Sequence, residues 1–262
     1  MTTFGSILCA VDASAAAARV VRHAAGVASA FGAPLTVLTV TSGAPVAAET
    51  ALREQVRVAL PEGAPMPELR VVKLAMGAVV DALLDAVEAS DLIVTGTHSK
   101  SGLSRWLLGS TSAALLAETP CPALLVPPGT VDLVAVDGGR AVLRPGAVMV
   151  AVDPSEGNDR QVQLAAAFAA HAGAPLVAMT VAGAGVDTAV AQQALEARCD
   201  AAGITPARVV VRQGVVADEI DHAAVAEGAG LVVMGLQARG DRGAVATAVL
   251  KGKDALVLAV PA

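Results

Sequence analysis

The sequence contains few aromatic residues and few charged ones. Aromatic side chains make up 2% of the 262 residues, with no tyrosine and a single tryptophan, Trp106. This scarcity argues against the aromatic platforms on which single-stranded nucleic acids stack. Charged residues make up 16%, and the net charge is −6 without a basic block. We therefore expect no nucleic-acid partner.

Cysteine is equally scarce. Cys9, Cys121 and Cys199 are far apart in the sequence and form no C-x-x-C pair, which argues against a zinc site and a disulfide framework. We expect buried free thiols in a reducing compartment. The first residues lack the basic stretch and apolar core of a signal peptide, so a cytoplasmic location is expected.

Apolar residues, by contrast, make up 55% of the chain, and one long stretch could be mistaken for a membrane span. Residues 161–186 carry no formal charge and are numerous enough to cross a bilayer. However, Gly173-Ala174-Pro175 interrupts the stretch, and proline breaks a helix. A helix that ends at Gly173, followed by a buried strand at 176–181, is the better prediction, and no membrane contact is expected.

The first half alternates short apolar runs with segments of helical periodicity. Continuous apolar strands that alternate with helices indicate a parallel sheet covered on both faces. The strands are expected at 7–12, 35–40, 69–74, 92–95 and 123–126, and the helices at 15–30, 47–60, 79–89 and 112–118.

The same pattern then repeats in the second half. Asp12 corresponds to Asp153, and Gly32-Ala33-Pro34-Leu35 corresponds to Gly173-Ala174-Pro175-Leu176, both at an offset of 141 residues. Matches in one order across both halves indicate two copies of one domain. The predicted fold is α/β, with two tandem doubly wound domains at 1–128 and 147–262. Each would be a five-stranded parallel sheet with helices on both faces. Residues 131–136, between the domains, could form an extra strand or pack on a sheet.

The stretch 92–111 carries the strongest functional signal. An apolar strand ends at Gly96, a loop of small and polar residues follows, and Gly109-Ser110-Thr111 precedes a second apolar run. A strand–loop–helix junction of this kind presents free backbone N–H groups and the positive end of a helix dipole, which suit a phosphate. An ordinary βα loop with a serine N-cap explains the same residues without a ligand.

The second copy of this loop differs. Gly96 corresponds to Gly235 at an offset of 139, and Val126 to Val260 at an offset of 134, so the second loop is shorter. If Gly243 stands for Gly109, Ala244 and Val245 replace the two hydroxyl residues. Asp241 would also bring a negative charge to the phosphate position.

These residues together resemble the universal stress protein family. The strand that ends in Val11-Asp12-Ala13-Ser14 is similar to the family's opening. The family motif is Gly, two residues, Gly, nine residues, then Gly-Ser or Gly-Thr. Gly96, Ser99 and Gly109-Ser110 keep that spacing, with Ser99 in place of the second glycine. The resemblance covers nearly the whole chain as a tandem pair.

The resemblance implies ATP, with Mg²⁺ as a candidate companion ion, in the first half. Asp12 and Val40 would lie against the adenosine, although Asp12 could instead cap the following helix. The loop residues expected to bind the nucleotide are Gly96, His98, Ser99, Gly102, Gly109, Ser110 and Thr111. Asp153 is expected to have a structural role in a second half that holds no ATP.

The implied function is an ATP-binding sensor or regulator of the stress response, with at most slow hydrolysis and no catalytic residues. The alternatives are a nucleotide-free protein-interaction module and an adenylylating or ATP-hydrolysing enzyme of a related fold. The resemblance also implies an intrachain pseudo-dimer through the last strands, a homodimer as a further option, and an unidentified protein partner.

Overall fold

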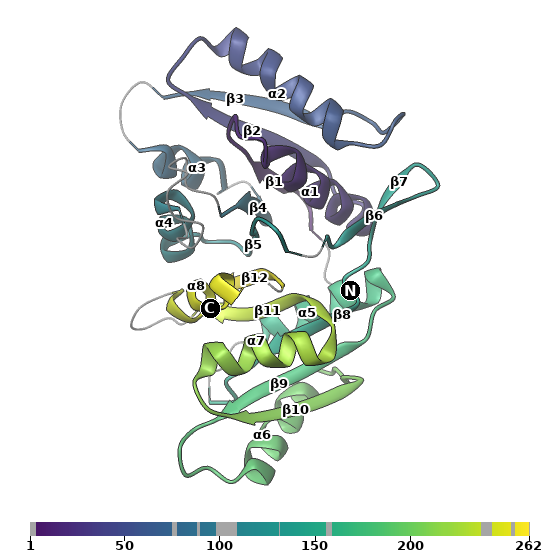
Figure 1. The fold of residues 1–262 in the computed structure, drawn as a ribbon, viewed down its shortest axis with the longest axis vertical. Coiled ribbons are helices and arrows are strands. Elements are labelled where there is room, and N and C mark those ends of the chain that lie inside the picture. The colour runs from purple at the N-terminus through teal and green to yellow at the C-terminus, as the bar shows by residue number, and fades with distance from the viewer. Residues whose placement is uncertain are drawn as a thin grey trace. The chain divides into compact units, whose positions relative to one another are not determined.

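The computed structural model describes residues 4–74, 78–87, 90–97, 109–130, 132–155, 159–236, 243–252 and 255–261. These residues divide into two compact units (Figure 1). One unit contains residues 3–128 and 134–143, and the other contains residues 129–133 and 144–262.

The first unit is built on five parallel strands in the order β3-β2-β1-β4-β5. The strands are β1 (Ile7–Ala10), β2 (Leu35–Thr41), β3 (Glu68–Lys73), β4 (Leu92–Gly96) and β5 (Ala123–Val126). The helices between them are α1 (Ala17–Phe31), α2 (Pro45–Ala59), α3 (Val79–Val87) and α4 (Ser110–Glu118). Helices α1 and α2 pack together, as do α3 and α4. Because the strand order reverses after β3, right-handed crossovers place the two pairs on opposite faces.

The second unit repeats this arrangement in the order β10-β9-β8-β11-β12. Its strands are β8 (Ala147–Ala151), β9 (Leu176–Ala182), β10 (Arg208–Gln213), β11 (Ala229–Leu236) and β12 (Leu256–Pro261). Its helices are α5 (Arg160–Ala172), α6 (Thr188–Ala201), α7 (Val216–Glu227) and α8 (Ala244–Gly252). The predicted fold class, two doubly wound α/β domains, is confirmed.

The repeat seen in the sequence is also present in the hydrogen bonding. The Val11 N–H donates to the Leu38 carbonyl at 3.0 Å, and the Val152 N–H donates to the Met179 carbonyl at 2.9 Å. Gly96 lies opposite Val126 in the first sheet, and Gly235 lies opposite Val260 in the second. The offsets in the sequence therefore match residues that hold equivalent places in the two sheets.

The central strands of both sheets are buried on the two faces, as continuous apolar strands require. Strands β1 and β5 are buried along their whole length, and so is β12. Cys9, Cys121 and Cys199 are free and buried, as expected. Within the described residues, no helix is long and apolar enough to cross a membrane. The uncharged stretch 161–186 forms helix α5 up to Ala172 and then strand β9, which confirms the interpretation of its central proline.

The segment between the halves forms an antiparallel hairpin, β6 (Val134–Asp137) and β7 (Arg140–Leu143). Gly138 and Gly139 form its two-residue turn, and both have positive φ angles, of 54° and 77°. Two positive φ angles in succession define the turn that matches the twist of a hairpin, and glycine adopts them without strain. The hairpin packs on α1 of the first unit. The expectation of one extra strand within 131–136 was therefore incomplete, because two strands form and they pair with each other.

Candidate functional site

The carboxyl edge of the first sheet brings several of the predicted residues together. The Val11 N–H bond to Leu38 continues the pairing of β1 with β2 and sets Asp12 beside Val40. Ala10 lies opposite Thr95, so Gly96 reaches the same edge. Asp12 and Val40 are half-buried. Ligands of doubly wound sheets bind at this edge, near the strand where the order reverses.

Asp12 closes a turn instead of capping a helix. Its Oδ1 accepts a hydrogen bond from the Ser14 N–H at 2.9 Å. Helix α1 begins later, with Ala16 as its N-cap and no side-chain capping bond. The alternative role of Asp12 as a helix cap is therefore wrong. β1 ends at Ala10, before the expected Asp12, because this turn has already begun.

Gln55 on α2 supports the same turn from the side. Its Nε2 donates to the Asp12 carbonyl at 3.3 Å and lies 3.5 Å from the Ser14 carbonyl. Sequence reasoning missed Gln55, because a lone glutamine in a helix carries no motif. Its effect is to hold the backbone after β1 in one conformation at the sheet edge.

The start of α4 is tied directly to the end of β4. The Ser112 hydroxyl donates to the Gly96 carbonyl at 2.9 Å, and the Gly109 N–H donates to the Thr97 carbonyl at 3.4 Å. Gly109 is buried and is the N-cap of α4, without a side-chain capping bond. Thr111 is half-buried in the first turn. The first N–H groups of a helix have no carbonyl partner within it, so this end is suited to an anion.

Not every predicted residue lies in the described part of the chain. His98, Ser99 and Gly102 lie outside the described residues, and Ser110 is described only as the first residue of α4. The strand ends and the helix start described above contain the remaining predicted residues, which are Asp12, Val40, Gly96, Gly109 and Thr111. Among the described residues, no group of His, Cys, Asp and Glu is arranged to hold a metal ion.

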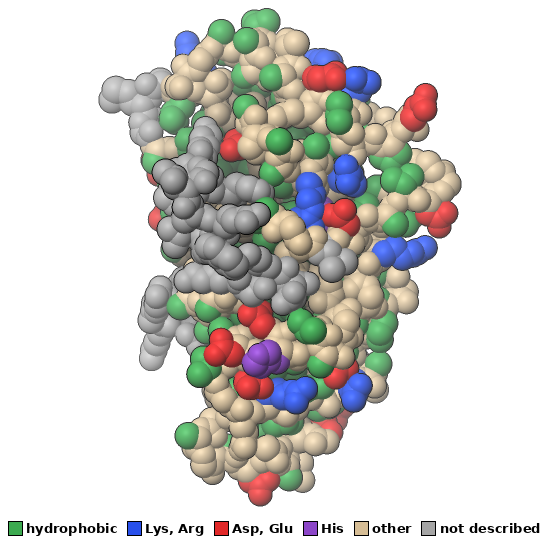
Figure 2. Space-filling view, viewed as in Figure 1, with side chains coloured by type: hydrophobic (Ala, Val, Ile, Leu, Met, Phe, Trp, Pro, Cys, Tyr) green, Lys and Arg blue, Asp and Glu red, His purple; other side chains and the backbone are tan. Residues whose placement is uncertain are grey.

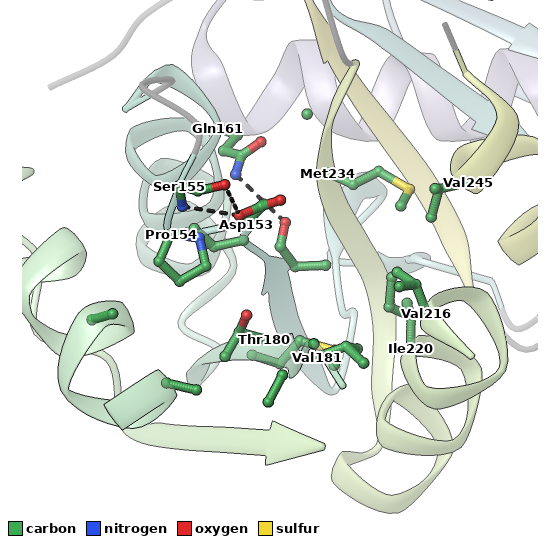
Figure 3. A pocket seen from close by; sticks show the side chains of 18 of the residues that line it. Asp153, Pro154, Ser155, Gln161, Thr180, Val181, Val216, Ile220, Met234 and Val245 are labelled. Carbon is green, nitrogen blue, oxygen red and sulfur yellow. Dashed lines mark hydrogen bonds between the residues drawn. The ribbon is translucent and has the colours of Figure 1, made fainter. Parts of the chain in front are cut away.

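The second unit contains a pocket of about 700 Å³ at the corresponding edge of its own sheet (Figure 3). Asp153 and Val181 line it, and they correspond in the repeat to Asp12 and Val40. Asp153 Oδ1 accepts from the Ser155 N–H at 2.9 Å and from the Ser155 hydroxyl at 2.6 Å. Both sheets therefore keep the same aspartate turn, and Asp153 has the structural contact expected of it.

Three polar side chains cluster at one side of this pocket. In Figure 3, Asp153, Ser155 and Gln161 gather on one side, and Met234 and Val245 lie across from them. Gln161 is 5% exposed and donates through Nε2 to the Ala151 carbonyl at 3.5 Å. A Cβ at Gly235 would overlap Gln161 Oε1, so glycine makes room for the amide.

The start of α8 confirms how the two helix starts correspond. The Thr247 N–H donates to the Gly243 carbonyl at 2.7 Å, as the Ala113 N–H donates to the Gly109 carbonyl at 2.9 Å. Gly243 thus takes the place of Gly109, and α8 begins with Ala244 and Val245 where α4 begins with Ser110 and Thr111.

Outside the pocket, charges of both signs are distributed over the surface. Acidic and basic side chains are interspersed among the described residues of the face in Figure 2. His222 on α7 is exposed, and its Nδ1 lies 3.9 Å from Glu219 Oε1. This histidine is a surface residue and does not belong to the pocket.

Comparison with known proteins agrees with this architecture. A model of the universal stress protein family matches residues 3–127. A universal stress protein of Thermus aquaticus, encoded in the 3′ region of a QAH/OAS sulfhydrylase, is 44% identical over 55 residues. That match spans 20% of this chain and 40% of the relative.

Two solved structures resemble the chain over nearly its full length. A universal stress protein from Archaeoglobus fulgidus has a TM-score of 0.68 and 19% identity, with 98% of this chain and 96% of that one covered. A structure from Pseudomonas aeruginosa, described as a universal stress protein, also has a TM-score of 0.68 and 19% identity. It covers 98% of this chain and 93% of its own.

The fold defines a doubly wound α/β domain that is present twice in one chain. The first half of the chain, residues 3–127, matches the universal stress protein family, and the second half repeats the fold of the first.

Proposed function

We propose that the first unit binds ATP at the carboxyl edge of its sheet, and that the protein acts as a nucleotide-binding sensor or regulator of the stress response. The observation that carries the proposal is the start of α4, which Ser112 and Gly109 join to the end of β4. Its first turn offers free N–H groups and the hydroxyl-bearing residues Ser110 and Thr111 to a phosphate.

The adenosine would lie toward β1 and β2, against Asp12 and Val40. One oxygen of Asp12 closes the turn with Ser14, and its Oδ2 accepts no hydrogen bond within the described part of the chain. A hydroxyl or amino group of a nucleoside could donate to that oxygen. Mg²⁺ would accompany the triphosphate, with ligands from the phosphates themselves.

The test compares one substitution at two corresponding helix starts. Ser110→Asp would place a carboxylate toward the triphosphate, where like charges cost several kcal/mol at an effective dielectric constant of about 20. Ala244→Asp makes the same change at the start of α8 and serves as the matched control. Titration calorimetry of nucleotide-free protein should show ATP binding by the parent and by Ala244→Asp, and none by Ser110→Asp.

Two further variants refine the result. Gly109→Asp should also abolish binding, and the backbone tolerates it, because φ of −59° and ψ of 147° are open to any residue. Ser110→Ala should weaken binding by about 1–3 kcal/mol, the range for a lost hydrogen bond to a charged group. ATP binding by Ser110→Asp at parental affinity would place the site elsewhere. No binding by the parent would favour a nucleotide-free interaction module.

A further inference from the structure

The pocket of the second unit has the size and lining of a small-molecule site. Its volume of about 700 Å³ lies within the ~300–1,000 Å³ range of ligand pockets, which are mostly apolar with a few placed polar groups. The apolar lining includes Val152, Met179, Val181, Ile220 and Met234. These side chains come from β9, β11, α7 and the residue that follows β8, so the pocket is part of the fold and not a feature of one loop.

Two polar side chains that line this pocket each leave one oxygen without a hydrogen bond within the described part of the chain. Gln161 and Thr180 are 5% and 3% exposed, and both line the pocket. Gln161 Oε1 accepts no hydrogen bond there, and the Thr180 hydroxyl makes none (Figure 3). The fully buried unpaired atoms of the described residues belong to other side chains, so these two atoms are open to the pocket, where water or a ligand can pair with them. Their orientation toward an apolar pocket indicates a ligand that donates a hydrogen bond.

The same pocket is poorly suited to a triphosphate. Ala244 and Val245 start α8 without hydroxyl groups, whereas Asp153 only repeats the Asp12 carboxylate of the first unit. Gln161 corresponds to the buried Val20 of the first unit, at the offset of 141 residues that also relates Asp12 to Asp153. The second unit has therefore lost phosphate-binding groups and gained a buried amide. Its described lining contains no cationic side chain.

We propose that the second unit binds an uncharged, mainly apolar small molecule that donates a hydrogen bond to Gln161 Oε1, and that it does not bind a nucleoside triphosphate. This inference concerns a site other than the proposed ATP site and does not depend on it. Either site could bind its ligand if the other did not.

The first experiment uses Nile red, an uncharged apolar dye whose fluorescence rises on burial, with the full chain. Val181→Trp would place a large ring system in the pocket, while Val225→Trp is the matched control at an exposed position of α7, outside the lining. The parent and Val225→Trp should bind the dye with equal affinity, and Val181→Trp should bind it at least tenfold more weakly. Equal binding by Val181→Trp, or no binding by the parent, would overturn the proposal.

The second experiment tests the hydrogen bond without filling the pocket. Carbazole and dibenzothiophene have nearly the same shape, but only carbazole carries an N–H donor. Carbazole should displace Nile red at a concentration roughly two- to tenfold lower, the effect of one net hydrogen bond. Gln161→Leu should remove this preference. A preference that persists in Gln161→Leu, or its absence in the parent, would contradict the assignment of Gln161.

The third measurement separates the two sites. ATP at millimolar concentration should leave the dye signal that depends on Val181 unchanged. Displacement of that signal by ATP would show that the second unit is a nucleotide site and would overturn the inference. The calorimetric comparison of Ser110→Asp with Ala244→Asp reports on ATP binding at the two helix starts, whereas the dye reports on the pocket, so failure of either proposal is recognised separately.

Discussion

At the scale of single residues, Cys9 shows how the centre of the first sheet affects chemistry. It lies in β1 between Val37 of β2 and Val94 of β4, and all three side chains are fully buried. Burial raises the pKa of the Cys9 thiol far above its ordinary value, because the thiolate would lose its hydration. Cys9 is therefore a structural residue, which agrees with the sequence-based expectation of buried free thiols.

This pKa shift predicts a loss of stability in alkali. Above the ordinary thiol pKa of about 8.5, the unfolded chain loses the Cys9 proton while the folded chain keeps it. Folding is therefore disfavoured by about 1.4 kcal/mol per pH unit, or ~2 kcal/mol at pH 10. Urea unfolding at pH 7.5 and pH 10, followed by circular dichroism, measures the difference. Cys9→Ala should be less stable overall but should lose ~2 kcal/mol less between the two pH values. An identical loss in both proteins would contradict the assignment.

Sequence predicts single site residues only where they belong to a pattern. Asp12, Gly96 and Gly109 follow or precede apolar runs, so their place at the sheet edge could be predicted from strand order alone. The place of Gln161 and Thr180 in the pocket could not be predicted in this way, because it depends on how the elements of the second unit pack around them. One signal for Gln161 was present: a polar residue replaces Val20 at a constant repeat offset.

At the scale of elements, the hairpin of β6 and β7 carries a local sequence signal that the expectation of one strand did not use. Asp137-Gly138-Gly139-Arg140 is a strong signal for a two-residue turn, and Asp137 does pair with Arg140. The apolar alternation on either side is short, so one strand was the natural expectation. Helix and strand order elsewhere followed from continuous apolar runs, and most boundaries shifted by one or two residues, where turns and caps decide them.

The contact of this hairpin with α1 yields a prediction about Gly26. Glycine in a helix interior normally costs about 1 kcal/mol relative to alanine. Here, however, a methyl group at position 26 would overlap the methyl groups of the buried Val134. Gly26→Ala should therefore lower the melting temperature and speed hydrogen exchange in α1. In the Val134→Ala background the same change should be stabilising, and the two variants together form a double-mutant cycle. If Gly26→Ala alone stabilised the protein, the hairpin would have moved to make room for the methyl group, and the predicted overlap with Val134 would be wrong.

At the scale of the whole molecule, the two copies of one fold share the aspartate turn after the first strand but differ at the start of the last helix. Both sheets keep the aspartate turn, with Ser14 N–Asp12 Oδ1 and Ser155 N–Asp153 Oδ1 each at 2.9 Å. Such a turn stabilises the backbone after the first strand of each sheet by itself, so it would persist with or without a ligand. The helix starts differ, because α4 carries Ser110 and Thr111 where α8 carries Ala244 and Val245.

This asymmetry predicts one ATP per chain, bound by the first unit. Each charge-assisted hydrogen bond to a phosphate is worth roughly 1.5–3 kcal/mol, so the loss of two weakens binding on the order of 100-fold or more. Calorimetric titration of the full chain should give a stoichiometry near one for the parent and for Ala244→Asp, and no binding for Ser110→Asp. If the parent gave a value near two, and Ala244→Asp reduced it to one, the second unit would also be a nucleotide site despite its helix start. The proposed division of the two units between nucleotide and uncharged ligand would then be wrong.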